Sequence, residues 1–213
     1  MATRLILIRH GQSIDNIAGR LSGWHESDLT PLGHLQAQRM AQHVAEAFQP
    51  TVVYASPLRR TAQTAEPLAR LLGQSIRFRD DLRELHFGVF EGRTLSEIIA
   101  EYPEEWERAR NNEESDLDFA WRGGESRRAF YERISNAILD LVQSHADESI
   151  AVVSHGGVLS SLVAWAIEGQ PQRWRHYQID NCSWSEALHQ DGEITVARWN
   201  VCDHLLTISV ETA

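Results

Sequence analysis

Short apolar runs alternate with stretches of helical periodicity, and this alternation constrains the fold more than any other feature of the sequence. The runs cover residues 5–8, 51–55 and 150–153 and are rich in β-branched side chains. Such runs are typical of strands buried on both faces of a parallel sheet. We therefore expect an α/β fold, a three-layer αβα sandwich with a mostly parallel central sheet.

The helical stretches begin at ordinary capping signals. Residues 30–31, Thr-Pro, place a hydroxyl at the N-cap and proline at the first helical position. A second helix is predicted over 58–72, where Pro67 should cause a bend or a break. Two more helices are predicted, one that starts at Ser126 and one over 158–167.

A β-hairpin is predicted toward the end of the chain. Its two runs cover residues 184–189 and 194–199, and Asp-Gly at 191–192 provides the turn. Aromatic side chains are enriched at protein interfaces. Trp184 and Trp199 are therefore a candidate surface for a homodimer.

Composition limits the possible partners. The chain has 213 residues, which suits a single domain over 1–213. Its net charge of -10 argues against a general nucleic-acid binder. No apolar run is long enough for a transmembrane helix or a secretory signal, so we expect a cytoplasmic protein with no membrane partner. Cys182 and Cys202 form no Cys-x-x-Cys motif, and no histidine spacing suits a zinc site, so no metal site is expected.

Arginine, histidine and glycine follow the three predicted strands. The segments are Arg-His-Gly at 9–11, Arg-Arg at 59–60 and His-Gly-Gly at 155–157. Parallel strands open their carboxyl ends at one crevice, so these residues should form a positive pocket. Arginine donors match phosphate oxygens, and glycine and a helix start bring backbone N–H groups close to an anion. Because a neutral imidazole can attack phosphorus, the pattern predicts a phosphate site that contains a nucleophile.

Cleavage of a phosphate monoester also requires a proton for the leaving alkoxide, and therefore a carboxylic acid beside the pocket. Glu84 is the favoured candidate because apolar neighbours surround it in the sequence. Asp80, Asp81 and Glu91 are alternatives that spacing alone does not exclude.

Ordered motifs along nearly the whole chain resemble the histidine phosphatase superfamily. That family includes cofactor-dependent phosphoglycerate mutases, fructose-2,6-bisphosphatases, α-ribazole phosphatases and broad-specificity phosphatases, and the last branch is the nearest in character. The motifs are Arg-His-Gly at 9–11 with Asn16, Gly-Arg-Leu-Ser-Gly-Trp at 19–24, Asp-Leu-Thr-Pro-Leu-Gly at 28–33, the block at 56–65, the segment 82–92 and Ser-His-Gly at 154–156.

The resemblance implies a reaction in two displacements through phosphohistidine, without metal or other cofactor. His10 would be the nucleophile, and Glu84 would protonate the leaving group and later activate water. Three residues would hold the phosphoryl oxygens: Arg9, Arg60 and His155. Five more would bind substrate: Gly11, Asn16, Ser22, Gly23 and Gly156. Arg59 would be a flanking residue.

The resemblance favours a phosphomonoesterase for small phosphorylated metabolites, with a phosphoglycerate mutase as the alternative. The interval from Glu84 to His155 is shorter than in the mutases, and Gly157-Val158 replaces their Asn-Ser. The segment 19–33 nevertheless resembles the mutases closely. A phosphate-binding domain without chemistry is less favoured because every catalytic position is filled.

A small helical insertion is predicted at about 94–125, where it would form a cap. Within it, the acidic residues of 101–118 are expected to face solvent. Trp121 and Arg122 are the residues there that would contact substrate if the insertion is a lid.

Overall fold

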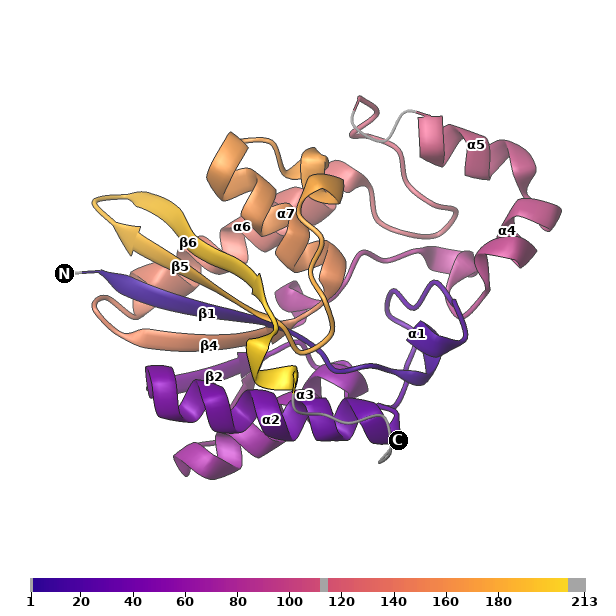
Figure 1. Cartoon of the computed structure of the whole chain (residues 1–213). Coiled ribbons are helices and arrows are strands. Elements are labelled where there is room, and N and C mark those ends of the chain that lie inside the picture. The colour runs from indigo at the N-terminus through magenta and orange to yellow at the C-terminus, as the bar shows by residue number, and fades with distance from the viewer. Residues whose placement is uncertain (1, 112–114, 207–213) are drawn as a thin grey trace.

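The computed structural model describes residues 2–111 and 115–206. Within them, six strands form one sheet in the order β3-β2-β4-β1-β5-β6 (Figure 1). The strands are β1 (Thr3–Arg9), β2 (Val52–Ala55), β3 (Ile76–Phe78), β4 (Ser149–Ser154), β5 (Trp184–Gln190) and β6 (Glu193–Val201). The first four in sheet order are parallel, and β5 and β6 are antiparallel to their neighbours. The predicted α/β class and mostly parallel sheet are confirmed.

Helices cover both faces of the sheet. One face carries α2 (Pro31–Phe48) and α3 (Arg59–Leu72), and the other carries α6 (Arg127–Ser144) and α7 (Gly156–Glu168) (Figure 1). Side chains of β1 alternate between the two cores: Leu5 lies in one, and Ile6 lies in the other. This alternation follows from the two-residue period of a strand. Leu5 and Ile6 are both fully buried, which explains why the apolar run is continuous and not alternating.

The helix boundaries agree with the predicted capping signals. The Thr30 hydroxyl accepts a hydrogen bond from the Gly33 amide at 3.0 Å, and the Ser126 hydroxyl caps α6 by accepting from Ala129. The expected break at Pro67 is wrong, because α3 continues through it. Buried side chains on both sides of Pro67, including Leu68, hold the helix on the sheet and offset the lost backbone hydrogen bond.

The hairpin is also confirmed. Asp191 and Gly192 both have positive φ, at 53° and 85°, as a type I′ turn requires. The suggested dimer surface is wrong for Trp184, whose side chain is buried in a core, whereas Trp199 is half exposed. Strand β3 was not predicted because its three residues are largely exposed and carry little pattern.

The segment from 94 to 125 lies beyond the carboxyl ends of the parallel strands (Figure 1). It contains α4 (Leu95–Glu101) and α5 (Pro103–Asn111) and has a small apolar cluster of its own that includes Phe119 and Trp121. Among the described acidic residues of 101–118, Glu101, Glu104, Glu107 and Asp118 are exposed, as expected, while Glu105 and Asp116 are half-buried. Glu113 and Glu114 lie outside the described residues.

Three shorter elements also position the site. They are α1 (Ile14–Ile17) and the 3-10 turns η1 (Asp80–Leu82) and η2 (Gly88–Phe90). Within residues 2–111 and 115–206, no helix is both long and apolar enough to cross a bilayer.

Candidate active site

The carboxyl ends of β1, β2 and β4 open into a cavity of about 560 Å³, which residues of the segment 94–125 also line, among them Leu95, Trp106 and Trp121. Eight of the ten predicted site residues line this cavity: Arg9, His10, Asn16, Ser22, Gly23, Arg60, Glu84 and Gly156. The other two, Gly11 and His155, lie directly behind the lining. Separate strand ends therefore converge as the sequence pattern predicted.

His10 is buried and has one ring nitrogen fixed. Its Nδ1 lies 2.8 Å from the carbonyl oxygen of Gly11. A carbonyl only accepts, so Nδ1 carries the proton, and the neutral ring keeps its lone pair on Nε2. Burial, and then the charges of Arg60 and Arg9, lower the pKa of His10 well below its ordinary value. An imidazole held in this state is a nucleophile at neutral pH.

The guanidinium groups of Arg60, which is buried, and Arg9, which is half-buried, flank this ring. Arg9 donates from Nη1 to the Ile179 carbonyl at 2.6 Å, and Arg60 donates to the carbonyls of Gly23 and His25. The Nε atoms of both arginines are buried and have no partner among the described residues. These N–H groups are donors that the protein fold does not use, and phosphate oxygens are the acceptors that they suit.

His155 lies beside His10, with ring centroids 5.4 Å apart. Its Nε2 is 2.8 Å from the Ser56 hydroxyl, and its buried Nδ1 has no partner among the described residues. Burial and the charge of Arg60 lower the pKa of His155 well below the ordinary value. Ser56, which orients this ring, was not singled out in the sequence because a lone serine after a strand is common.

Glu84 is the acid that reaches the cavity. Its Oε2 accepts a hydrogen bond from the Gly157 amide at 2.9 Å, and its Oε1 accepts from the Leu85 amide at 3.0 Å. Glu84 also lies close enough to Arg9 and Arg60 for its charge to raise their pKa values against the lowering by burial. The rivals lie elsewhere: Asp80 and Asp81 pair with Arg83 and Arg79, and Glu91 accepts from the amides of Trp24 and Phe87.

Gly11 and Gly157 of the motifs allow close contacts within the protein. A Cβ on Gly11 would lie 2.6 Å from the carbonyl oxygen of Gly33, so Gly11 allows two backbones to touch. A Cβ on Gly157 would lie 2.5 Å from the Glu84 Oε1. The amide at the start of α7 was expected to face phosphate, but in this structure it binds Glu84.

Asn181 is a site residue that sequence reasoning missed. Its Nδ2 donates to the His10 carbonyl at 2.9 Å and to the Asn16 Oδ1 at 3.2 Å. It thereby ties the predicted substrate contact Asn16 to the backbone of the candidate nucleophile. No motif marks Asn181, because it precedes β5 in an irregular segment that comes next to β1 only in the folded chain.

The outer part of the cavity is aromatic and positively charged. Its lining includes Trp106, Trp121, Trp174, Arg20, Arg110, Arg127 and Arg175. Glu84 is the sole carboxylate among the lining residues that the structure describes. The positive charge of the cavity contrasts with the net charge of -10 of the whole chain, so an anionic ligand is favoured at this place.

Trp121 and Arg122, the two residues expected to contact substrate if the segment 94–125 is a lid, lie in different surroundings. Trp121 is buried and lines the cavity, whereas Arg122 is exposed and pairs with Glu105. Trp24 does not line the cavity, and its indole donates to the Glu84 carbonyl instead. Among the described residues, no group of three or more His, Cys, Asp or Glu side chains has an arrangement that could hold a metal ion.

Several known proteins match over most of the chain. A phosphoserine phosphatase 1 from Hydrogenobacter thermophilus is 28% identical, over 98% of this chain and 97% of its own. A phosphoglycerate mutase-like protein 4 from Arabidopsis thaliana is 32% identical, over 94% of this chain and 86% of its own. The crystal structure of the α-ribazole phosphatase from Shigella flexneri superimposes with a TM-score of 0.85, at 28% identity, over 93% and 96% of the two chains.

The family model agrees with this pattern. The model for the histidine phosphatase superfamily, branch 1, matches residues 5–202. That range includes every residue of the candidate site. The chain belongs to branch 1 of the histidine phosphatase superfamily.

Proposed function

We propose that this chain is a metal-independent phosphomonoesterase that hydrolyses small phosphorylated metabolites through a phosphohistidine at His10. One observation carries the proposal: the His10 ring has Nδ1 fixed by a carbonyl and lines a cavity together with Arg9, Arg60 and one acid, Glu84. This arrangement provides a nucleophile, donors for the phosphoryl oxygens and a proton donor within one site.

In the first displacement, Nε2 of His10 attacks phosphorus and the P–O bond to the leaving group breaks. Protonated Glu84 gives its proton to the leaving oxygen, which departs as an alcohol. The Nε groups of Arg9 and Arg60 and the Nδ1 of His155 face the negative charge on the transferred group.

In the second displacement, water attacks the phosphorus of phosphohistidine. The Glu84 carboxylate takes a proton from this water, and the N–P bond breaks to release inorganic phosphate. The electron pair returns to His10 Nε2, and Glu84 is protonated again for the next cycle. Each step conserves charge and protons without a metal ion.

Substrate contacts complete the proposal. Asn16, Ser22, Gly23 and Gly156 line the cavity near the phosphoryl site and bind the phosphate end. The outer arginines favour a leaving group that carries a negative charge of its own. The name of the Hydrogenobacter relative, a phosphoserine phosphatase, agrees with a small substrate of this kind.

Phosphatase activity is favoured over mutase activity. The Hydrogenobacter relative, which matches over nearly the full length of both chains, is named a phosphatase. The structural neighbour from Shigella is also named a phosphatase. The interval from Glu84 to His155 is also shorter than the family resemblance implies for a mutase. A mutase remains the second candidate because another relative carries a mutase-like name.

The cellular setting is part of the proposal. Cys182 and Cys202 are both unpaired thiols, as they would be in a reducing compartment such as the cytoplasm.

Hydrolysis of p-nitrophenyl phosphate in the presence of EDTA tests the reaction type. We expect activity that EDTA leaves unchanged, that His10→Ala abolishes, and that the control His34→Ala retains, since His34 is exposed on α2. Activity that needs an added metal would contradict the proposal. A 3-phosphoglycerate assay primed with a bisphosphoglycerate separates the alternatives, because isomerisation faster than hydrolysis would identify a mutase.

A further inference from the structure

Glu84 stands on an irregular segment between η1 and η2, without helix or strand around it. Backbone carbonyls in such a segment need partners from elsewhere when they are buried. The carboxylate of Glu84 is useful only if this backbone holds it beside His10. The partners of the segment therefore decide where the candidate acid lies.

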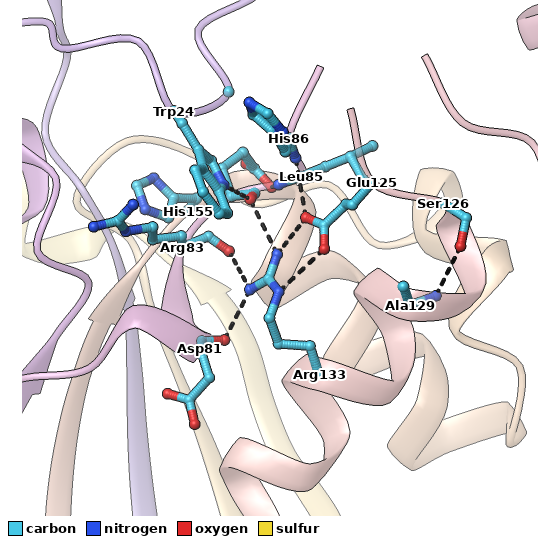
Figure 2. Close-up of polar contacts among 12 residues, drawn as sticks. Trp24, Asp81, Arg83, Leu85, His86, Glu125, Ser126, Ala129, Arg133 and His155 are labelled. Atoms are coloured by element: carbon cyan, nitrogen blue, oxygen red, sulfur yellow. Dashed lines mark hydrogen bonds and ion pairs between the residues drawn. The ribbon is translucent and has the colours of Figure 1, made fainter. Parts of the chain in front are cut away.

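Arg133 of α6 binds three carbonyls of this part of the chain. Its Nη1 donates to the carbonyls of Asp81 and Arg83, at 2.9 and 2.8 Å, and its Nη2 donates to the carbonyl of Glu84 at 3.2 Å (Figure 2). The two remaining donors of the guanidinium bind the carboxylate of Glu125. All five N–H groups of Arg133 are thus committed, three of them to one short stretch of backbone.

Glu125 holds the same segment from its other end. Its carboxylate accepts from the His86 amide at 3.0 Å, and its own amide donates to the His86 carbonyl at 3.1 Å. The Arg133–Glu125 pair is mostly buried, with the two side chains 19% and 16% exposed. Glu125 binds the Nε and Nη2 edge of the guanidinium, which leaves the edge formed by Nη1 and Nη2 facing the carbonyls (Figure 2).

The Glu84 carbonyl has a second donor on its other side. The indole Nε1 of Trp24 donates to it at 2.7 Å. Trp24 is packed in turn against the Arg83 guanidinium, 4.8 Å from its ring, and against the His86 ring. Two side chains from distant parts of the sequence, Trp24 and Arg133, therefore hold the same peptide group (Figure 2).

We propose that Arg133 is a positioning residue, which with Glu125 and Trp24 holds the backbone of Glu84 so that its carboxylate meets the leaving group. Arg133 does not line the cavity, so the role proposed for it passes through the backbone that carries Glu84. The proposal rests on the proposed function, since it takes Glu84 as the proton donor.

The geometry explains why arginine is needed at this position. A guanidinium offers five donors in one plane, whereas a lysine ammonium offers three in a compact point charge. Arg133→Lys keeps the charge but cannot reach three carbonyls and a carboxylate together. We therefore expect Arg133→Lys to resemble Arg133→Met and not the unsubstituted enzyme.

The test compares kcat/KM for two substrates of similar size, benzyl phosphate and p-nitrophenyl phosphate. Benzyl alcohol is a much poorer leaving group and needs a proton from the acid, while p-nitrophenolate leaves without one. Arg133→Met should lower kcat/KM for benzyl phosphate at least about tenfold more than for p-nitrophenyl phosphate. Arg128→Met is the matched control on the same helix, because Arg128 is exposed and pairs with Asp118.

A double-mutant comparison tests whether the effect passes through Glu84. In a chain that already carries Glu84→Gln, Arg133→Met should change kcat/KM for benzyl phosphate by less than about twofold, since coupled residues are not additive. Equal losses on both substrates, or a full further loss in the Glu84→Gln chain, would overturn the proposal and leave Arg133 as a structural residue.

A milder variant covers the case in which Arg133→Met does not fold. Trp24→Phe keeps the aromatic packing and removes only the donor to the Glu84 carbonyl, so it should show the same dependence on the leaving group to a smaller degree. A folded Trp24→Phe variant that loses kcat/KM equally on both substrates, or on neither, would also overturn the proposal. Failure of the proposed function is a separate result, seen as activity retained in His10→Ala or as no leaving-group dependence in Glu84→Gln.

Discussion

The carboxylate of Glu84 accepts a hydrogen bond from the Gly157 amide at 2.9 Å, in the first turn of α7. A helix start is a natural anion site, and the anion here is the carboxylate of the protein itself. The contact exists because Gly157 has no side chain, since a Cβ there would lie 2.5 Å from the Glu84 Oε1. The glycine after the Ser-His-Gly motif therefore matters for the acid and not only for phosphate.

Gly157→Ala should displace the Glu84 carboxylate and lower kcat for an alkyl phosphate by about 10- to 100-fold, within the range for a misplaced acid. Steady-state kinetics measures the loss. In a chain with Glu84→Ala, the new methyl group no longer meets that carboxylate. Gly157→Ala should then lower kcat only slightly. A full loss of kcat in the Glu84→Ala chain would show that Gly157 acts by another route.

Gly11→Ala should instead destabilise the fold. The added Cβ would press on the carbonyl oxygen of Gly33 at 2.6 Å, and backbone on this side of α2 cannot move away cheaply. We expect a loss of about 1–3 kcal/mol in the free energy of unfolding, measured by urea denaturation. The remaining folded enzyme should keep a KM near that of the unsubstituted chain. Unchanged stability would contradict this role for Gly11.

The stability of the protein should fall as pH decreases below about 6.5, the ordinary pKa of histidine. His10 and His155 have pKa values well below it in the folded chain, chiefly because of burial. In this window the unfolded chain binds protons that the folded chain does not, so each histidine contributes a slope of up to about 1.4 kcal/mol per pH unit.

Urea denaturation at several pH values measures this slope. His10→Gln should reduce the slope by the share of one histidine. A slope that is the same in His10→Gln would show that His10 titrates normally in the fold.

The outer arginines should act on charged leaving groups only. Arg110 lines the cavity from α5, and Arg110→Met should raise KM about 10-fold or more for a phosphate ester with a carboxylate, as expected for a lost charged hydrogen bond. The KM for p-nitrophenyl phosphate should change little. Arg108→Met on the same helix is the control, because Arg108 pairs with Asp116 and does not line the cavity. Equal effects on both substrates would contradict a role in recognising the charge.

The sequence predicted the sheet and the strand-end residues well because both follow from local patterns. Apolar runs such as residues 5–8 are buried on both faces, and His10 and His155 follow their strands directly. Strand β3 and the continuous helix at Pro67 were not predicted, since tertiary packing determines both.

The residues that position the site were harder to find. Arg133, Trp24 and Asn181 act through backbone carbonyls that are distant in sequence, and no local motif marks such contacts. Ser56 orients His155 through its side-chain hydroxyl, which is equally distant in the sequence. A sequence pattern identifies side chains whose chemistry is unusual, whereas the partners of an irregular backbone become visible only in the fold.

Trapping of the covalent intermediate tests the central claim most directly. The enzyme is mixed with a phosphate monoester, quenched within a turnover, digested and examined by mass spectrometry under alkaline conditions that preserve phosphohistidine. The account predicts a phosphoryl group on His10 that is labile to acid and absent from His10→Ala. A phosphoryl group on another residue, or turnover by His10→Ala at the rate of the unsubstituted enzyme, would contradict it.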